Sequence, residues 1–479
     1  MSEEASLPMD DLMKVLLEDE VLTLRELERA LWALASEVVR QGLVEFLERK
    51  DKQLEEGRDR RRYELRGRER REVETLVGVV RFWRRRYVDR EGGGSVYLLD
   101  ERLGLAKRVR VSDGLAELSV FWAVKGPSYR DACNRLKELM GYQVISHETI
   151  RQAGLKLAER VRREDARVAA GAGGARKVKE IFIEADGVWA SLQGRGRGPR
   201  EAKVAVAYEG WRVRQGGGGR GDFTLVRPRY ISGLDHGEGF WERVRGALSA
   251  EYRDIDETLV VLNGDDAGWI EAGAEHFGRC VYQRDRYHVA RDLRCALAGR
   301  AEGREALAAL RRGDTVGVVE SVAAACRGVS DEATRDRLTR LGAGLAAAGG
   351  SIIDYRVRLA AVGHEVDPGW RGLGAVEATV KRYKHRIGKR GRAWSQRGLE
   401  AILTLQDKLY EGTLLEKVTG LSVELGSAPC EAHGLPPGKV PEAVGQGDPG
   451  RRGHVPALDA GMTGWAKVLR NLTRVECPW

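Results

Sequence analysis

The sequence predicts a multidomain α+β / α/β protein whose centre is a mixed β-sheet covered by helices. Three consecutive apolar runs between residues 177 and 234 have the composition of strands. After them, helical and strand-like segments alternate to about residue 300, which indicates a sheet with helices packed on its faces. Apart from one hairpin, the segments before residue 169 and after residue 300 have helical periodicity or no strand signal. A chain of 479 residues can hold two to four such units.

The N-terminal region, residues 1–75, is predicted to be helical. Thr23 to Glu26 form a capping-box pattern, in which the first and fourth side chains can each satisfy a free backbone N–H group. Apolar residues follow at helical spacing; they are Leu27, Leu31, Leu34 and Val38. The pattern continues, with more charged residues, to about Arg71.

Residues 76–168 are predicted to hold a β-hairpin and then a helix-turn-helix. The hairpin would join 75–88 to 95–105 through the glycine turn at 92–94. Its first strand interleaves Trp83 and Tyr87 with arginines, which fits either contact with a DNA backbone or a half-buried strand with one wet face.

The helix-turn-helix would consist of two helices joined by a turn at 141–145, with Ser146 capping the second helix. His147, Arg151 and Gln152 would then point outward, as in a reader of the DNA major groove. Ordinary helical hairpins have the same pattern, so both interpretations stay open.

The remaining organisation follows from a glycine- and alanine-rich linker at 169–175. Residues 176–300 give the order βββαβαβα, which is the layout of the RNase H-like fold. Residues 301–365 lack strands and are predicted to be a helical insertion, and 366–412 supply the last helices of the core. Residues 413–479 form a tail rich in Pro and Gly.

The positive charge of the chain is clustered. Lys and Arg number 81 against 72 Asp and Glu, which gives a net charge of +9. Much of the excess lies in three segments, 58–71, 81–86 and 381–392. Such clusters suit a polyanion such as nucleic acid, while solvated helix faces are the alternative for each of them.

The sequence also predicts a cytoplasmic protein without a membrane segment. Its acidic start is not followed by an apolar segment of signal-peptide type. No uncharged apolar stretch reaches the roughly 18 residues that a spanning helix needs. The six cysteines are scattered without a CxxC pair, which favours a reducing compartment.

Three acidic residues are candidates for a metal site. Asp186 follows the strand-like run IFIEA, Asp265 follows TLVVLNG, and Glu377 lies on a helix that begins near Gly374. Carboxylates at strand ends can converge on divalent cations that hold the oxygens of a reacting phosphodiester. Each has an ordinary alternative: a turn Asp before Gly, turn chemistry in NGDD, and a surface Glu–Lys pair. Glu184 could join the site or pair with a base.

Taken together, these segments resemble the bacterial insertion-sequence transposases of the ISLre type, an RNase H-like DDE group related to the mutator-type transposases. The resemblance covers roughly residues 76–405. Its matching segments include IEADGVWASLQ, YEGW, LNGDDAGWI, RDRYHVARDL and LGAVEATVKRYKHRI. The resemblance implies a transposase that cleaves DNA and transfers strands, with Asp186, Asp265 and Glu377 as its catalytic triad.

The resemblance further implies two Mg²⁺ ions, which Mn²⁺ could replace, held by the triad. Asp285 and His288 would lie nearby as accessory residues. Asp266 stands where we expect glycine, so it is either a further ligand or a sign that the element has drifted. The partners would be double-stranded DNA, as element ends and target, and a second copy of the chain in a homodimer or larger assembly. The basic residues expected to hold phosphates are Lys381, Lys384, Arg386, Lys389 and Arg390.

Two rival functions remain. The first is a nuclease on the same type of sheet that cuts DNA without joining it. The second is a DNA-binding protein that derives from a transposase and has lost catalysis. A strand-transfer assay separates the transposase from both rivals.

Overall fold

The computed structural model describes residues 23–419 except 108, 141–142, 172, 195–196, 214–222 and 389–390. The chain divides into two compact units, one formed by 1–156 with 418–479 and one by 157–417. The division falls inside a helix, ahead of the linker predicted at 169–175. Most of the predicted tail and residues 1–22 lie outside the described residues.

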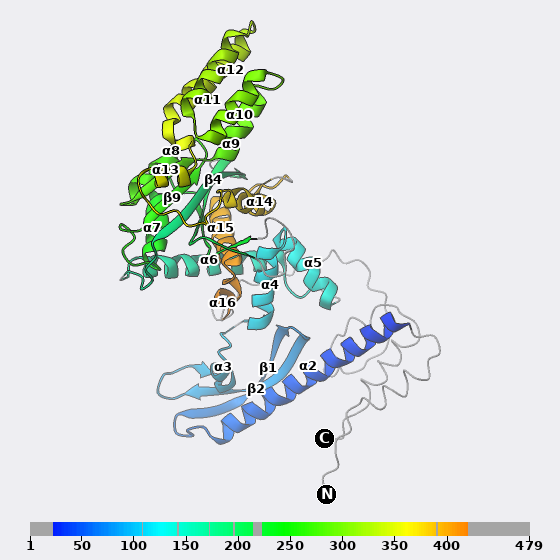
Figure 1. Cartoon of the computed structure of the whole chain (residues 1–479). Coiled ribbons are helices and arrows are strands. Elements are labelled where there is room, and N and C mark those ends of the chain that lie inside the picture. Colours follow the sequence, from blue (N-terminus) through cyan, green and yellow to red (C-terminus); the bar gives the residue numbers. More distant parts are fainter. Residues whose placement is uncertain are drawn as a thin grey trace. The chain divides into compact units, whose positions relative to one another are not determined.

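The first unit is built around the long helix α2, Leu24–Glu56 (Figure 1). Its capping box is confirmed: the Thr23 side chain accepts from the Glu26 backbone N–H, and the Glu26 carboxylate accepts from the Thr23 N–H at 3.0 Å. The C-terminal part of α2 packs on a sheet, where Val44, Leu47 and Leu54 meet its buried apolar residues.

The sheet of this unit differs from the predicted hairpin. Strand β1, Tyr63–Thr75, pairs antiparallel with β2, Gly78–Asp89, and β3 is only Ser95–Val96. The prediction of helix up to Arg71 was therefore wrong. The second predicted strand was wrong as well, because Leu98–Leu103 forms the short helix α3.

Cross-strand ion pairs explain why β1 gave no strand signal. Arg81 bonds Glu72 at 2.7 Å from the position directly opposite, and Arg86 bonds Glu69 at 3.1 Å. Opposite charges that face each other stabilise antiparallel strands. Because both faces of β1 carry charges, the strand lacks the apolar alternation that identifies strands in a sequence.

A buried ion pair joins α2 to β2, and breaking it is expected to destabilise this unit. Asp51 is 1% exposed, and its carboxylate accepts from the Arg85 side chain at 2.6 Å and from the Arg85 backbone N–H at 3.1 Å. Asp51→Ala leaves a buried guanidinium with Glu55 as its remaining acid. We expect a loss of about 3 kcal/mol in stability of this unit, measured by urea unfolding followed through amide exchange in β2. The exposed control Glu56→Ala should change little, and equal effects of the two would contradict the prediction.

Three helices follow the sheet: α4, Asp113–Lys125, α5, Tyr129–Met140, and α6, His147–Ala169. Helix α4 packs against α5. Ser146 accepts from the Thr149 backbone N–H at 3.0 Å, which confirms the predicted cap of the second helix. The two helices are thus placed as the sequence predicted, while residues 141–142 of the predicted turn lie outside the described residues.

The second unit contains the predicted mixed sheet. Its strand order is β10-β9-β4-β5-β8. Strands β4, β5 and β8 run antiparallel as neighbours, whereas β9 and β10 run parallel to β4. The bounds are β4 Glu180–Leu192, β5 Gly198–Tyr208, β8 Arg229–Gly233, β9 Leu259–Gly264 and β10 Cys280–Arg284. Between β5 and β8, the chain forms a small hairpin of β6, Trp211–Val213, and β7, Phe223–Leu225.

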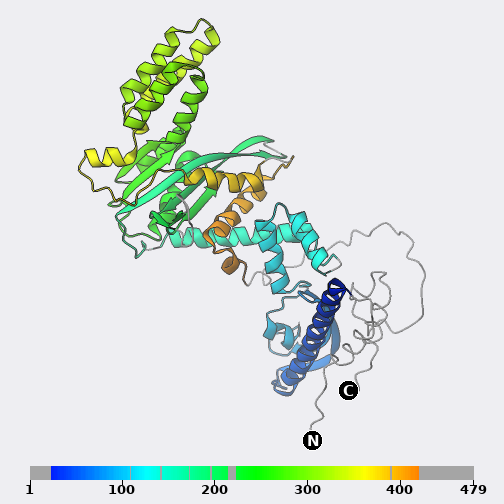
Figure 2. The same cartoon turned by 45° about the vertical axis from the view of Figure 1, so that its right-hand side comes forward.

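Helices cover both faces of this sheet (Figures 1 and 2). One face packs on α7, Gly237–Ser249, and α8, Gly268–Glu271, around Trp241. The other face packs on α13, Tyr355–Ala361, around Phe182 and Tyr208. On that second face, α14, Ala375–Ile387, contacts β4, and α15, Gln396–Glu411, contacts β8.

The helical insertion is present and has its own core. Helix α9, Arg286–Ala296, leads into α10, Ala301–Arg312, α11, Thr315–Arg327, and α12, Glu332–Ala348. Buried aliphatic residues such as Leu293, Val322 and Leu338 hold these helices together. Figures 1 and 2 show α10 to α12 extending beyond the sheet. The chain returns to the sheet through a short 3₁₀ helix, Gly349–Ile352, and a last short helix is α16, Leu414–Val418.

Candidate active site

The register of the parallel strands places acidic residues at one edge of the sheet. Glu184 on β4 lies opposite Asn263 on β9, and Asn263 lies opposite Gln283 on β10. Two residues further along the chain come the acids Asp186, which lies on β4, and Asp265 and Asp285, which directly follow β9 and β10. Glu184, Asn263 and Gln283 form a polar row across the strands, and the three aspartates form a second row beside it. Because residues two apart share a face, both rows lie on the face that α13 and α14 cover.

Strand β4 does not end at Asp186 as predicted. It continues to Leu192 by pairing with β5, while its parallel pairing with β9 stops at Ala185 opposite Gly264. Asp186 therefore lies in the middle of a strand and still at the edge of the parallel part of the sheet. A side chain on Gly264 would not fit there, since a Cβ would lie 2.9 Å from the Ala185 carbonyl oxygen.

The electrostatic environment of Asp186 includes both of the other predicted carboxylates. The pKa of Asp186 is raised to about 6, mainly by burial, and the negative charges of Asp265 and Glu377 contribute to that rise. The backbone N–H of Gly187, which donates at 2.7 Å, and the neighbouring His288 act in the opposite direction. The pKa of Asp186 is thus raised by burial first and by the two other acids in smaller part.

Asp265 combines turn chemistry with a place at the site. Its Oδ1 accepts from the Ala267 N–H at 3.0 Å, and its carbonyl accepts from the Tyr282 hydroxyl at 2.7 Å. Asp266 is exposed and bonds Arg284 at 2.7 Å.

Glu377 lies in the first turn of α14, with its side chain 42% exposed. The buried residues along one side of this helix are Val376, Val380, Tyr383 and Ile387. Glu377 bonds Lys381 at 3.2 Å, as the surface-pair alternative proposed. It also acts on the pKa of Asp186, so the pair and the site are compatible.

Asp285 and His288 lie at the start of α9, directly after β10. Asp285 is buried and caps α9, since its Oδ1 accepts from the N–H groups of Tyr287 at 2.7 Å and His288 at 3.3 Å. The Nδ1 of His288 lies 3.9 Å from the Asp285 carboxylate and has no hydrogen-bond partner among the described residues.

The polar row of Glu184, Asn263 and Gln283 was not predicted as a set. Glu184 and Asn263 are 0% exposed and Gln283 is 3% exposed. Gln283 donates to Asn263 at 3.0 Å, and Asn263 donates to Glu184 at 3.5 Å. A sequence signal existed, because the same polar-x-Asp pattern occurs in all three runs: EAD within β4, NGD at the end of β9 and QRD at the end of β10.

The predicted basic track after Glu377 is only partly exposed. Lys381 and Lys384 face solvent, whereas Arg386 is 3% exposed with its guanidinium 5.0 Å from the Trp394 ring centre. The prediction that Arg386 contacts DNA is wrong for that reason. Lys389 and Arg390 lie outside the described residues. Trp394 anchors the helix end to β4. Its indole N–H donates to the Ile387 carbonyl, and its backbone N–H donates to the Ser191 carbonyl.

In α6, an acidic residue holds the side chains that the sequence predicted to contact DNA. Glu148 accepts from Arg151 at 2.6 and 2.8 Å and from Gln152 at 2.8 Å, while His147 is exposed. The Arg151 hydrogen bond lowers the pKa of Glu148 to about 2. Glu148 is therefore charged at neutral pH, and sequence reasoning missed it.

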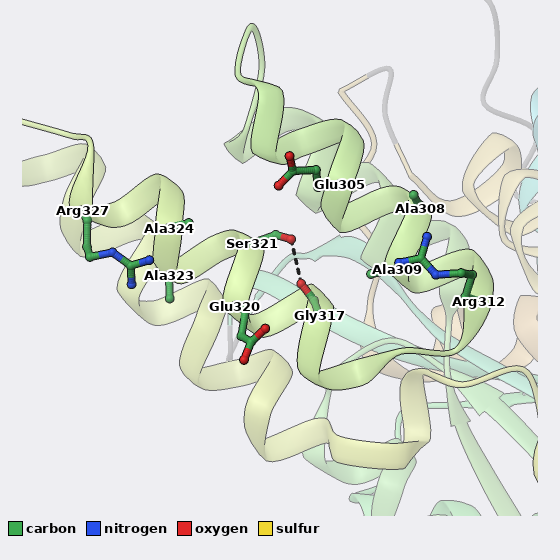
Figure 3. A pocket seen from close by; sticks show the side chains of 10 residues that line it. All are labelled: Glu305, Ala308, Ala309, Arg312, Gly317, Glu320, Ser321, Ala323, Ala324 and Arg327. Carbon is green, nitrogen blue, oxygen red and sulfur yellow. Dashed lines mark hydrogen bonds between the residues drawn. The ribbon is translucent and has the colours of Figure 1, made fainter.

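Carboxylate oxygens are the ligands that Mg²⁺ prefers, so the donor types fit such an ion. Within the described part of the chain, however, no three acidic, His or Cys side chains are close enough together to hold a metal ion. A pocket of about 590 Å³ lies elsewhere, between α10 and α11, and contains none of the predicted site residues (Figure 3). Small side chains such as Ala309 and Ala324 line it, with Glu305 and Arg312 among its charged residues.

Comparison with known proteins decides the family. The model of the uncharacterised protein family UPF0236 matches residues 17–421. The chain belongs to this family. The UPF0236 description names no activity.

Individual relatives in UPF0236 agree with the family match. The chain is 28% identical over 399 residues to a Streptococcus gallolyticus protein named "UPF0236 protein in vanSb 3'region", covering 81% of this chain and 83% of the relative. It is 24% identical over 301 residues to a protein of Caldanaerobacter subterraneus subsp. tengcongensis, covering 62% and 60%. The name of that second relative joins eleven locus designations, from TTE0033 to TTE2212. In this UPF0236 chain, none of the helices in the described segments is long and apolar enough to cross a membrane.

Proposed function

We propose that this chain is a DNA transposase of the DDE type, which cleaves DNA and transfers strands with Asp186, Asp265 and Glu377. The observation that carries the proposal is the raised pKa of Asp186, to which burial, Asp265 and Glu377 contribute. Carboxylates that oppose one another's ionisation are common at catalytic sites, because the reaction needs the perturbed groups.

The sheet supports the proposal. An RNase H-like fold has three antiparallel strands followed by two parallel ones, and the order β8-β5-β4-β9-β10 agrees with that layout. Asp186 lies on the central strand β4 and Asp265 follows the adjacent β9. In sheets of this type, ligands bind where the parallel strands end.

The residues present fit a divalent cation by their chemistry. Asp186, Asp265 and Glu377 would hold Mg²⁺ or Mn²⁺, which when bound polarises the phosphodiester and activates the attacking oxygen. The positive charge would also relieve the repulsion that raises the pKa of Asp186. To join the two aspartates at the metal, Glu377 would have to leave its ion pair with Lys381. Its side chain is partly exposed and can rotate to do so. His288 would orient a phosphate oxygen or a carboxylate.

The chain's own cations would hold the DNA. Lys381 and Lys384 extend from Glu377 along one exposed side of α14 and would contact phosphates. The helix-turn-helix would read the element ends through His147, Arg151 and Gln152. Because two ends must be joined to a target, we propose that a homodimer or larger assembly acts on double-stranded DNA.

The relative with eleven locus designations supports a mobile element. One protein name that covers many loci of one organism is what repeated copying of its gene produces. A conserved housekeeping nuclease has no such reason to occur at many loci.

The decisive experiment incubates the purified chain with labelled element ends, target DNA and Mg²⁺. We expect cleavage at the ends and covalent joining of the freed 3′ ends to the target. Cleavage without joining would identify a nuclease. DNA binding with steep salt dependence and no Mg²⁺-dependent product would identify a binding protein.

Glu148 provides a separate prediction for DNA binding. Glu148→Gln removes a negative charge and releases Arg151, so we expect binding of element ends to tighten severalfold. Arg151→Ala should weaken binding and reduce sequence preference. Gel-shift titrations at several salt concentrations measure both effects. If Glu148→Gln weakens binding as Arg151→Ala does, the helix does not face DNA.

A further inference from the structure

Glu184 connects the two elements that carry Asp186 and Glu377. Its carboxylate lies on β4, fully buried, two residues before Asp186. The Oε1 atom accepts from the Ala375 backbone N–H at 3.0 Å and from the Tyr208 hydroxyl at 2.6 Å. The Oε2 atom accepts from the Val376 N–H at 3.3 Å and from the Asn263 amide at 3.5 Å.

The first turn of α14 depends on this acceptor. The first backbone N–H groups of a helix have no carbonyl partner within the helix. The residue before α14 is Gly374, which has no side chain to cap it, so the acceptor comes from the sheet instead. A carboxylate is also favoured at the positive end of the helix dipole. Burial raises the pKa of Glu184, and the hydrogen bonds from Tyr208 and the helix N–H groups oppose that rise.

We infer that Glu184 is a positioning residue that fixes the first turn of α14, and with it Glu377, against the strand that carries Asp186. The two bonded N–H groups belong to the residues directly before Glu377. A shift of this turn moves Glu377 away from the aspartates without any change in the acids themselves. This inference rests on the proposed function in so far as the positioned group is a metal ligand.

Glu184 acts through α14 and is not itself a ligand. Both of its oxygens are occupied by donors from four different residues, and the side chain has no exposed surface. The same carboxylate also accepts from the Asn263 amide, so it connects the polar row of Glu184, Asn263 and Gln283 to α14 as well.

The test uses Glu184→Gln in the full chain. The amide keeps the size of the side chain but replaces one acceptor by a donor, which then faces the donors that Glu184 now satisfies. We expect amide exchange in a peptide covering 374–380 to become about tenfold faster. We expect the dissociation constant for Mn²⁺, measured by direct titration, to rise by about tenfold, as for other groups that orient a ligand.

Two controls separate positioning from general damage. Tyr208→Phe removes one donor to Glu184 but leaves both helix bonds, and should leave exchange at 374–380 unchanged. Asp331→Ala removes the side-chain cap of α12, which accepts from the Thr334 N–H at 2.8 Å, and should leave Mn²⁺ binding unchanged. Unchanged exchange in Glu184→Gln, or faster exchange with unchanged Mn²⁺ binding, would overturn the inference. A wild-type chain that binds no Mn²⁺ overturns the proposed metal chemistry and the role of Glu184 in it, while the exchange result still decides whether Glu184 fixes α14.

Discussion

Asp186→Asn is expected to abolish DNA cleavage and, above pH 7, to stabilise the fold. Activity should fall more than about a hundredfold, the upper range for residues that only orient a ligand. Folding raises the pKa of Asp186 from its ordinary range to about 6, so the folded chain disfavours the charged carboxylate. The cost is absent below about pH 4, grows as the pH rises to 6, and is complete above that.

The neutral amide removes this cost. One pKa unit corresponds to about 1.4 kcal/mol, so we expect a gain of roughly 2 kcal/mol at pH 8, after allowance for partial exposure, and none at pH 4. Urea unfolding at the two pH values measures it. The matched control is Asp266→Asn, which changes an exposed neighbour of the site. It should change neither cleavage nor the pH dependence of stability. Normal cleavage by Asp186→Asn, or a loss of stability at pH 8, would contradict the assignment.

Glu377→Gln is expected to eliminate cleavage and strand transfer together, again by more than about a hundredfold, while the fold is unchanged. The side chain is partly exposed, and its pair with Lys381 is worth only a few tenths of a kcal/mol. A large activity loss with an unaltered melting temperature therefore points to chemistry and not to stability.

The matched control for Glu377 is Glu332→Gln, which changes another exposed glutamate in the first turn of a helix, α12. It should retain full activity in the same strand-transfer assay. If Glu377→Gln still cleaves and joins at the wild-type rate, the third carboxylate of the triad has been assigned wrongly. Loss of joining with normal cleavage would instead limit Glu377 to strand transfer.

Where local pattern and burial agree, the sequence predicted the structure. The runs around Ile183 and Val261 are apolar because their strands are buried on both faces, and the helix of Val376 and Tyr383 has a clear apolar stripe. The same logic failed for β1, because its strand is stabilised by pairs such as Glu72–Arg81. Charge pairing across a hairpin requires knowledge of the partner strand.

The sequence by itself determined the mixed sheet with its helical insertion, the helix boundaries around Ser146, and the three acids worth examining. The tertiary structure decided what each polar side chain meets. It buried Arg386 on Trp394, paired Asp266 with Arg284, and used Glu184 to cap α14. Periodicity reports which face of an element is buried, but partners 190 residues apart meet only through the register of the sheet and the packing of the helix on it.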